Sequence, residues 1–158
     1  MIEESTYKIK LIDFGLSRAL STSSLEPYEM SFVPGSGKGP GALEDSNSHI
    51  CLRYMAPEVF LQETYSLSAD VYSYGLVIYY LFCSELPFQN LSIDEIRSHF
   101  NTGTTNKLLD TGRIPYLEIR QIVERCICRE PGERITMEAV CATLETMTFK
   151  STGCCVLL

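Results

Sequence analysis

The stretch Ser68–Cys83, which reads S-A-D-V-Y-S-Y-G-L-V-I-Y-Y-L-F-C, decides the fold. From Val71 onward nearly every position is apolar or aromatic, and a helix without a polar stripe is one that is buried on all sides. The run is too long for a strand and shorter than the about 20 apolar residues that a membrane span needs. We therefore predict a buried central helix, with Ser68 as its cap. Asp70 would lie in the first turn, where the helix dipole favours a carboxylate.

The composition is that of an ordinary globular domain. The chain has 158 residues, of which 45% are hydrophobic and 21% charged, so it is long enough for one core. Its net charge of −7, with no basic stripe, argues against nucleic-acid binding. Its 7 cysteines lack the paired spacing of a zinc site, and residues 1–20 lack the apolar core of a secretory signal. Reduced thiols in a cytoplasmic protein are therefore expected.

The first part of the chain predicts a short strand that ends in an acidic residue. Tyr7–Ile12 alternates apolar and polar residues, as a half-buried strand does. It leads directly into Asp13, Phe14 and Gly15. A carboxylate at the end of a strand, followed by glycine, can face a metal ion or a phosphate. As a bare tripeptide this is weak evidence, because aspartate in this position is more commonly a turn former.

Residues 19–47 are rich in Ser, Pro and Gly and predict a flexible insert, longer than most connections in compact domains. Lys38 follows a glycine, which invites comparison with a phosphate-binding loop. The spacing excludes that motif, because Phe32 stands where a glycine is required and Gly39 where Ser or Thr is required.

Further helices are expected around the central one. Pro57 suits the first position of a short helix, with Glu58 in its first turn. Three later segments carry helical patterns, at Ser92–Phe100, Tyr116–Cys128 and Thr136–Met147, and the first and last of these begin with a capping residue. The expected fold is mainly α: about five helices, one of them the buried central helix around which the others pack, with a short N-terminal strand and a long loop.

These pieces, in this order, resemble the carboxyl-terminal lobe of a eukaryotic protein kinase. Each motif is weak alone, but five in series cover roughly residues 8–147. The motifs are K-L-I-D-F-G at Lys10–Gly15, Y-M-A-P-E at Tyr54–Glu58, S-A-D-V-Y-S-Y-G at Ser68–Gly75, L-P-F at Leu86–Phe88 and C-I-C-R-E-P-G-E-R at Cys126–Arg134. The resemblance implies a partial kinase domain at 1–148, with an activation segment at 13–58, and a tail at 149–158.

The resemblance implies ATP and Mg²⁺ as cofactors. Asp13 would hold the Mg²⁺ that bridges the ATP phosphates, since a hard cation requires oxygen ligands. Phe14 would pack differently in active and inactive states, and Gly15 would complete this cofactor-binding motif.

The resemblance also implies three structural residues. Glu58 and Arg134 would form a buried ion pair that ties the activation segment to the last helices. Asp70 would accept hydrogen bonds from the backbone of the catalytic loop. A carboxylate that merely suits the helix dipole is the alternative for Asp70.

A substrate-site loop is implied at Ile50–Ala56, with Cys51, Arg53 and Tyr54 as its candidate residues. The triplet R-Y-M at 53–55 favours a tyrosine-kinase-like Ser/Thr kinase, because tyrosine kinases usually carry Trp at the position of Tyr54. Ser/Thr kinases usually have Gly-Thr where this chain has Ile-Cys at 50–51. That Thr helps to position catalytic residues, so its absence leaves Ser/Thr against Tyr specificity open.

As part of a complete domain, the chain would transfer the γ-phosphate of ATP to Ser or Thr of a protein substrate. The 158 residues contain no Gly-rich loop, strand Lys with its partner Glu, or H-R-D-x-x-x-x-N loop. Positioning and charge stabilisation are the catalysis in this chemistry, so the isolated chain is expected to be inactive. Without a catalytic loop over it, part of the central helix should expose an apolar face. The alternative is a non-catalytic docking module that binds a protein through Ile50–Ala56 and Ser92–Phe100.

The tail carries a separate signal. Cys155–Leu158 reads C-V-L-L, a prenylation pattern whose final Leu predicts geranylgeranylation of Cys155, with Cys154 as a candidate palmitoylation site. One lipid gives weak anchoring, and the usual polybasic support is absent. An apolar terminus without a lipid is the alternative. The expected location is the cytoplasm, with weak membrane association when Cys155 is prenylated.

Overall fold

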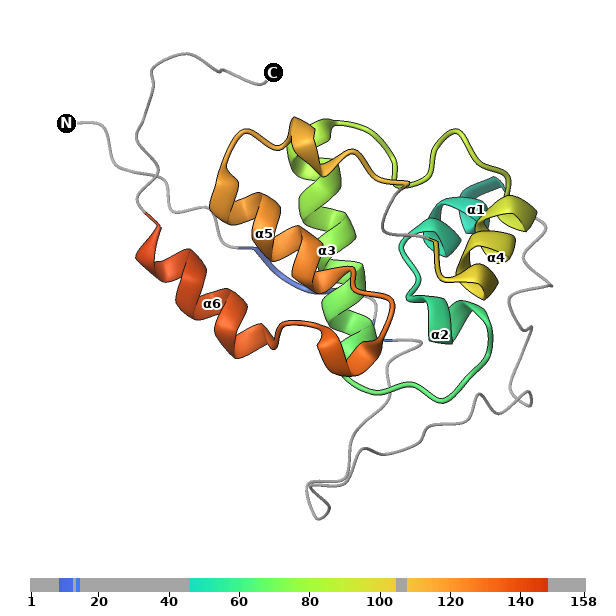
Figure 1. Cartoon of the computed structure of the whole chain (residues 1–158), viewed down its shortest axis with the longest axis horizontal. Helices are drawn as coiled ribbons and strands as arrows, with labels where there is room; N and C mark the ends of the chain where they lie inside the picture. The colour runs from blue at the N-terminus through green and yellow to red at the C-terminus, as the bar shows by residue number, and fades with distance from the viewer. Residues whose placement is uncertain (1–8, 13, 15–45, 105–107, 148–158) are drawn as a thin grey trace.

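A computed structural model describes residues 9–12, 14, 46–104 and 108–147, and this part of the chain is mainly helical (Figure 1). Two short 3₁₀ turns, η4 (Thr111–Arg113) and η5 (Pro131–Glu133), connect the later helices. The α-helices are α1 (Ser46–Arg53), α2 (Pro57–Phe60), α3 (Ser68–Cys83), α4 (Ile93–Thr102), α5 (Leu117–Cys126) and α6 (Met137–Thr146). The mainly α fold predicted from the sequence is confirmed.

The central helix α3 has the predicted bounds, but it is not capped as predicted. Leu67 occupies the N-cap position, and no side chain caps the helix. Ser68 is already helical, and its hydroxyl pairs instead with that of Ser66 at 2.8 Å. At the other end Ser84 adopts a left-handed conformation, and its backbone N–H donates to the carbonyl of Tyr80. Asp70 lies in the first turn, as predicted.

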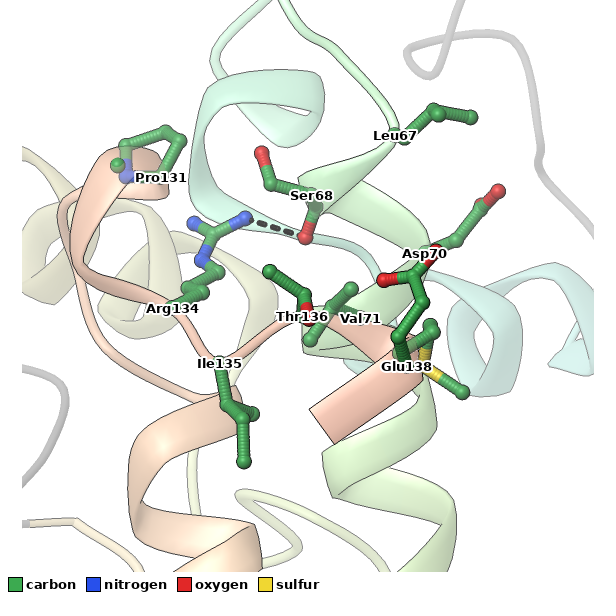
Figure 2. A pocket seen from close by; sticks show the side chains of 11 residues that line it. Leu67, Ser68, Asp70, Val71, Pro131, Arg134, Ile135, Thr136 and Glu138 are labelled. Atoms are coloured by element: carbon green, nitrogen blue, oxygen red, sulfur yellow. Dashed lines mark hydrogen bonds between the residues drawn. The ribbon is translucent and has the colours of Figure 1, made fainter. Parts of the chain in front are cut away.

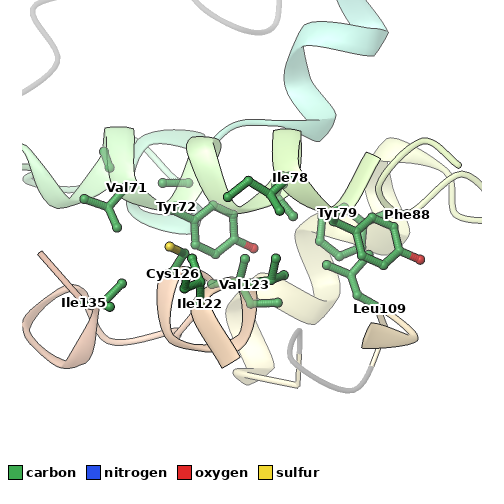
Figure 3. Packing of buried hydrophobic residues seen from close by; sticks show 14 of the residues in the cluster. Val71, Tyr72, Ile78, Tyr79, Phe88, Leu109, Ile122, Val123, Cys126 and Ile135 are labelled. Carbon is green, nitrogen blue, oxygen red and sulfur yellow. The ribbon is translucent and has the colours of Figure 1, made fainter. Parts of the chain in front are cut away.

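α3 and α5 pack closely enough to require a glycine between them. A Cβ added at Gly75 would lie 2.5 Å from the Cβ of Cys126 and 3.1 Å from Cγ2 of Ile127. Figure 3 shows Tyr72 among Ile122, Val123 and Cys126, where the two helices meet. All of these residues are buried, and they form the centre of the hydrophobic core.

One face of α3 remains exposed. Val77 is 44% exposed, Tyr80 43% and Leu81 66%. The prediction of a helix buried on all sides is therefore wrong for this face. The second expectation, an apolar face left uncovered in this chain, is confirmed. An exposed apolar patch of this kind favours association with another molecule.

The remaining predicted helices are confirmed within one or two residues at their ends. Ser92 caps α4, because its hydroxyl accepts from the backbone N–H of Glu95 while the Glu95 carboxylate accepts from the backbone N–H of Ser92. Thr136 caps α6 through its hydroxyl, which accepts a hydrogen bond from the backbone N–H of Ala139. Pro57 begins α2, where the lack of an N–H costs nothing.

Two predictions for the first third of the chain are wrong. Residues 9–12 of the expected strand Tyr7–Ile12 have no regular structure and are exposed, and residues 7 and 8 lie outside the described part. A strand requires a partner for its backbone groups, and the described residues contain no strand. The expected loop character also fails from Ser46 onward, since α1 covers the last two residues of the insert and the first four of Ile50–Ala56.

Candidate functional site

The candidate site is built around Glu58 and Arg134, which the structure brings together from distant parts of the sequence. Glu58 lies in the first turn of α2, held there by Pro57 at the start of the helix. Arg134 follows η5, in an extended conformation that leads into α6. Arg134 Nη1 lies 2.6 Å from Glu58 Oε1, and Nη2 lies 2.8 Å from Oε2. Both side chains are almost completely buried.

Arg134 uses all of its donors. Besides the two bonds to Glu58, Nη1 donates to the backbone carbonyl of Ser68 at 2.8 Å. Nε donates to the carbonyl of Cys128 at 2.9 Å, and Nη2 donates to that of Arg129 at 3.2 Å. A guanidinium has five N–H groups, and these five bonds account for them. The side chain therefore joins α2, the first turn of α3 and the segment that follows α5.

The surroundings of Arg134 explain why the pair can be buried. Its guanidinium carbon lies 4.9 Å from the centre of the Tyr72 ring, a cation–π contact. Burial raises the pKa of the Tyr72 hydroxyl, and this effect outweighs the opposing influence of Arg134, so Tyr72 stays neutral. A charge taken out of water is costly unless it is paired and hydrogen-bonded, and Arg134 satisfies both conditions. Removing either member of such a pair costs about 3–5 kcal/mol.

Asp70 lies at the mouth of a pocket beside this pair. The pocket has a volume of about 430 Å³ and lies between the beginnings of α3 and α6 (Figure 2). Arg134 forms part of its wall, and Figure 2 shows Asp70 on the side opposite Arg134. The Asp70 side chain is exposed.

The three substrate-site candidates occupy α1 and the turn after it. Cys51 is exposed on α1. Arg53 donates from Nη1 to the carbonyl of Phe88 and from Nη2 to that of Leu91, the latter at 2.9 Å. Burial raises the pKa of the Tyr54 hydroxyl, and nearby Tyr80 raises it further. Arg53 thus fastens the end of α1 to the segment between α3 and α4.

Of the remaining predicted site residues, the structure describes only Phe14. Asp13, Gly15, Cys154 and Cys155 lie outside the described residues. Phe14 is 66% exposed. Among the residues that the structure describes, no group of three or more His, Cys, Asp or Glu side chains could hold a metal ion. None of the helices in this part of the chain is both long and apolar enough to cross a bilayer.

Two sets of hydrogen bonds, from Arg53 and from Arg134, were missed by the sequence reasoning. The acceptors of Arg53 are backbone carbonyls 35 and 38 residues away, and a carbonyl gives no signal in the amino-acid sequence. The bonds from Arg134 to the carbonyls of Ser68 and Cys128 were missed for the same reason. Gly75 does give a signal: a glycine within an apolar helix often marks a close approach.

Comparison with known proteins identifies the family. The protein kinase domain family matches residues 1–144 of this chain, so the chain belongs to that family. Serine/threonine-protein kinase VIK of Arabidopsis thaliana is 27% identical over 146 residues, which are 92% of this chain and 30% of that protein. Seven transmembrane domain-containing tyrosine-protein kinase 1 of Dictyostelium discoideum is 36% identical over 146 residues, 92% of this chain and 18% of that protein. The chain thus spans less than a third of either relative.

Proposed function

We propose that this chain supplies the carboxyl-terminal lobe of a tyrosine-kinase-like protein kinase. In a complete domain this lobe would support transfer of the ATP γ-phosphate to Ser or Thr of a protein substrate. The observation that carries the proposal is the buried pair Glu58–Arg134, together with the bond from Arg134 to Ser68. We further propose that the 158 residues alone do not transfer phosphate, because they lack the catalytic loop and the strand Lys.

The pair supports this function by fixing two elements relative to each other. α2 directly follows the proposed substrate-site segment, and α3 carries Asp70 in its first turn. Arg134 bonds to both elements, so it would fix the position of the substrate-site segment relative to Asp70. Catalysis of phosphoryl transfer depends almost entirely on positioning and charge stabilisation. This lobe would therefore contribute the fixed relative positions of the substrate-site segment and Asp70.

The family resemblance suggests which residues would meet the cofactor. Asp13 would bind Mg²⁺, and bound Mg²⁺ neutralises charge on the ATP phosphates during transfer. Asp70 would accept hydrogen bonds from a catalytic-loop backbone supplied by the rest of the domain. Cys51, Arg53 and Tyr54 would border the peptide substrate. Of these three, Arg53 acts through the segment that it fastens.

A hybrid protein tests the proposal. Residues 9–147 replace the matching segment of the kinase domain of Serine/threonine-protein kinase VIK, and transfer of labelled γ-phosphate to a mixed protein substrate is measured. We expect an active hybrid that labels Ser and Thr, and no labelling by the 158-residue chain alone. Asp13→Asn in the hybrid should abolish transfer, whereas Glu145→Gln, an exposed substitution on α6, should leave it unchanged.

Each outcome of this experiment has a distinct meaning. Transfer that depends on Asp13 in the isolated chain would overturn the inactivity of that chain. Labelling of Tyr alone would overturn the Ser/Thr assignment. A hybrid that folds, as judged by circular dichroism and a sharp thermal transition, but transfers nothing would favour the docking module. That module would present α1 and α4, which contact each other.

We propose separately that the protein is cytoplasmic and that Cys155 is prenylated. The proposal of prenylation rests on the C-V-L-L pattern alone. Intact mass of the protein from eukaryotic cells would show one geranylgeranyl group, and Cys155→Ser would remove it. An unmodified mass for the unsubstituted chain would refute the proposal.

A further inference from the structure

Phe88 has a backbone conformation that is unusual for its residue type. Its φ of 54° lies in the left-handed region, where the Cβ of an L-residue comes too close to the following carbonyl oxygen. Within the described part of the chain, Gln62 and Ser84 also have positive φ, but both are exposed, whereas the Phe88 side chain is buried. A bulky residue keeps such a conformation only where its surroundings impose it, and strain of this kind is concentrated at functional sites. The contacts that impose it therefore indicate what Phe88 does.

Contacts of the ring and of the carbonyl hold Phe88 in this conformation. Its ring packs edge-on against that of Phe100 in α4, with ring centres 6.1 Å apart. Its carbonyl accepts two hydrogen bonds, one from Arg53 Nη1 and one from the backbone N–H of Leu91 at 3.0 Å. Arg53 Nη2 donates to the carbonyl of Leu91, so one guanidinium binds both ends of this turn. Rotation of the Phe88 φ to negative values would move both carbonyls away from Arg53.

The same contacts attach one end of the proposed substrate-site segment. Arg53 lies within that segment, as the last residue of α1, and its attachment point is Phe88. Glu58 follows the segment and is held by Arg134. Residues 54–57 alone lie between these two attachments. This short stretch keeps one position only as long as both attachments persist, so the conformation of Phe88 bears on the position of the substrate-site segment.

We propose that Phe88 is a positioning residue for the peptide substrate. Its left-handed backbone places the carbonyls that bind Arg53, and Arg53 in turn holds the substrate-site segment where it receives the peptide. Phe88 would contact neither ATP nor the reacting hydroxyl, so its loss should raise the KM for the peptide and leave kcat unchanged. This inference rests on the proposed function and adds to it a residue that governs peptide affinity.

Two substitutions of Phe88 separate the backbone conformation from the ring. Phe88→Ala and Phe88→Gly both remove the ring, but glycine adopts positive φ readily and alanine does not. Both are made in the hybrid kinase and assayed with a synthetic peptide that spans the Ser or Thr labelled most strongly by the unsubstituted hybrid. Phe88→Ala should raise the peptide KM about ten-fold, the size of one charged hydrogen bond. Phe88→Gly should stay within about two- to three-fold of the unsubstituted hybrid, because Arg53 keeps its acceptors. A role limited to packing predicts no rescue by glycine, since both variants lose the same ring.

Further variants test whether Arg53 carries this difference. In an Arg53→Met background the KM values of Phe88→Ala and Phe88→Gly should become equal, because no donor remains to be positioned. Ser84→Gly is the matched control: Ser84 has the same φ of 54° and is exposed, so relief of its strain should leave the KM unchanged. Arg53→Lys tests the linkage without the loss of a buried ring. An ammonium group lacks the planar fork that bonds both carbonyls, so the KM should rise in this variant too.

Amide hydrogen exchange of the 158-residue chain tests the linkage without catalysis. The N–H group of Tyr54 donates to the carbonyl of Cys51 at 3.1 Å, within the substrate-site segment. The N–H group of Ile127, which is buried in the core, reports on the stability of the whole chain. Phe88→Ala should speed exchange at Tyr54 about ten-fold relative to exchange at Ile127, and Phe88→Gly should speed it less. Arg53→Lys should also speed it.

The two readouts separate a failure of this inference from a failure of the proposed function. A hybrid without activity would overturn the proposed function and the role of Phe88 in peptide binding with it, while exchange at Tyr54 would still decide whether Phe88 holds the segment. Equal exchange at Tyr54 in the unsubstituted chain and in both Phe88 variants would overturn the linkage. In an active hybrid, equal KM values for Phe88→Ala and Phe88→Gly, or a fall in kcat with KM unchanged, would overturn the role in peptide binding. If neither Phe88 variant folds, an unchanged KM in Arg53→Lys would overturn it.

Discussion

Replacing Gly75 by alanine tests the close approach of α3 to α5. The new Cβ would lie 2.5 Å from the Cβ of Cys126, and carbon atoms at optimal separation are about 3.5–4.0 Å apart. The helices would have to separate by about 1 Å at this point. Overpacking of a core costs about 1–3 kcal/mol, and the better helix propensity of alanine returns about 1 kcal/mol. Because both clashing atoms are attached to backbone, we expect a net loss of about 1–2 kcal/mol in the free energy of unfolding.

Urea unfolding followed by far-ultraviolet circular dichroism measures this loss. Gly132→Ala is the matched control, since a Cβ there meets nothing within 4 Å, and we expect a change within about 0.5 kcal/mol. A double-mutant cycle identifies the clashing atom. Cys126→Gly, which removes the Cβ, should relieve much of the effect of Gly75→Ala, whereas Cys126→Ala, which keeps it, should not. A Gly75→Ala protein as stable as the original would refute the reasoning. So would a result in which Cys126→Gly and Cys126→Ala reduce the destabilisation by Gly75→Ala equally.

Three further predictions follow from contacts at the surface and at the ends of helices. Arg53→Met should lower the free energy of unfolding by about 2–3 kcal/mol, because two backbone carbonyls lose a charged donor. Urea unfolding measures this loss, and an unchanged midpoint would contradict the prediction. Leu81→Lys should leave the thermal midpoint almost unchanged while reducing association in sedimentation velocity, since the side chain is 66% exposed; equal association would argue against the α3 patch. Hydrogen bonds from the Ser92 backbone and hydroxyl lower the pKa of Glu95 from its ordinary 4.5. The ionised Glu95 carboxylate therefore stabilises the folded protein at pH values above 4.5, and this stabilisation is lost as the pH falls through the lowered pKa. Glu95→Ala should slightly destabilise the protein at neutral pH and not in strong acid. A pH-independent difference would refute this explanation.

The helices were predictable where the pattern and the caps agreed. α3 was found at its bounds because its apolar run is the length of one helix, and α4 because Ser92 and Glu95 have the spacing of a capping box. α1 was missed, since S-N-S-H-I-C-L-R has only two strongly apolar residues and follows a Ser- and Gly-rich stretch. The cap of α3 was misjudged because the helix already includes Ser68, whose hydroxyl pairs with that of Ser66.

The candidate site was less accessible to sequence reasoning. Glu58 and Arg134 are 76 residues apart, and only the resemblance to a family suggested that they pair. Periodicity places each residue on an element, but it does not say which elements meet. The pocket beside them depends on the relative placement of α3 and α6, so no local pattern could have predicted it. Val77 and Leu81 were predicted to be buried because they are apolar, but both are exposed. Whether an apolar side chain is buried depends on which other elements pack against it, and the sequence of its own helix does not show that.

The long separation between Glu58 and Arg134 has a consequence for folding kinetics. Bringing their segments together closes a loop of 76 residues, and the entropic cost of closure precedes any gain from the contact. We therefore expect the pair to form after the helices between them, late on the folding pathway. Interactions that are absent from the transition state mainly slow unfolding. On this view Arg134 determines how long the folded chain survives between unfolding events, and has little influence on how quickly the chain folds.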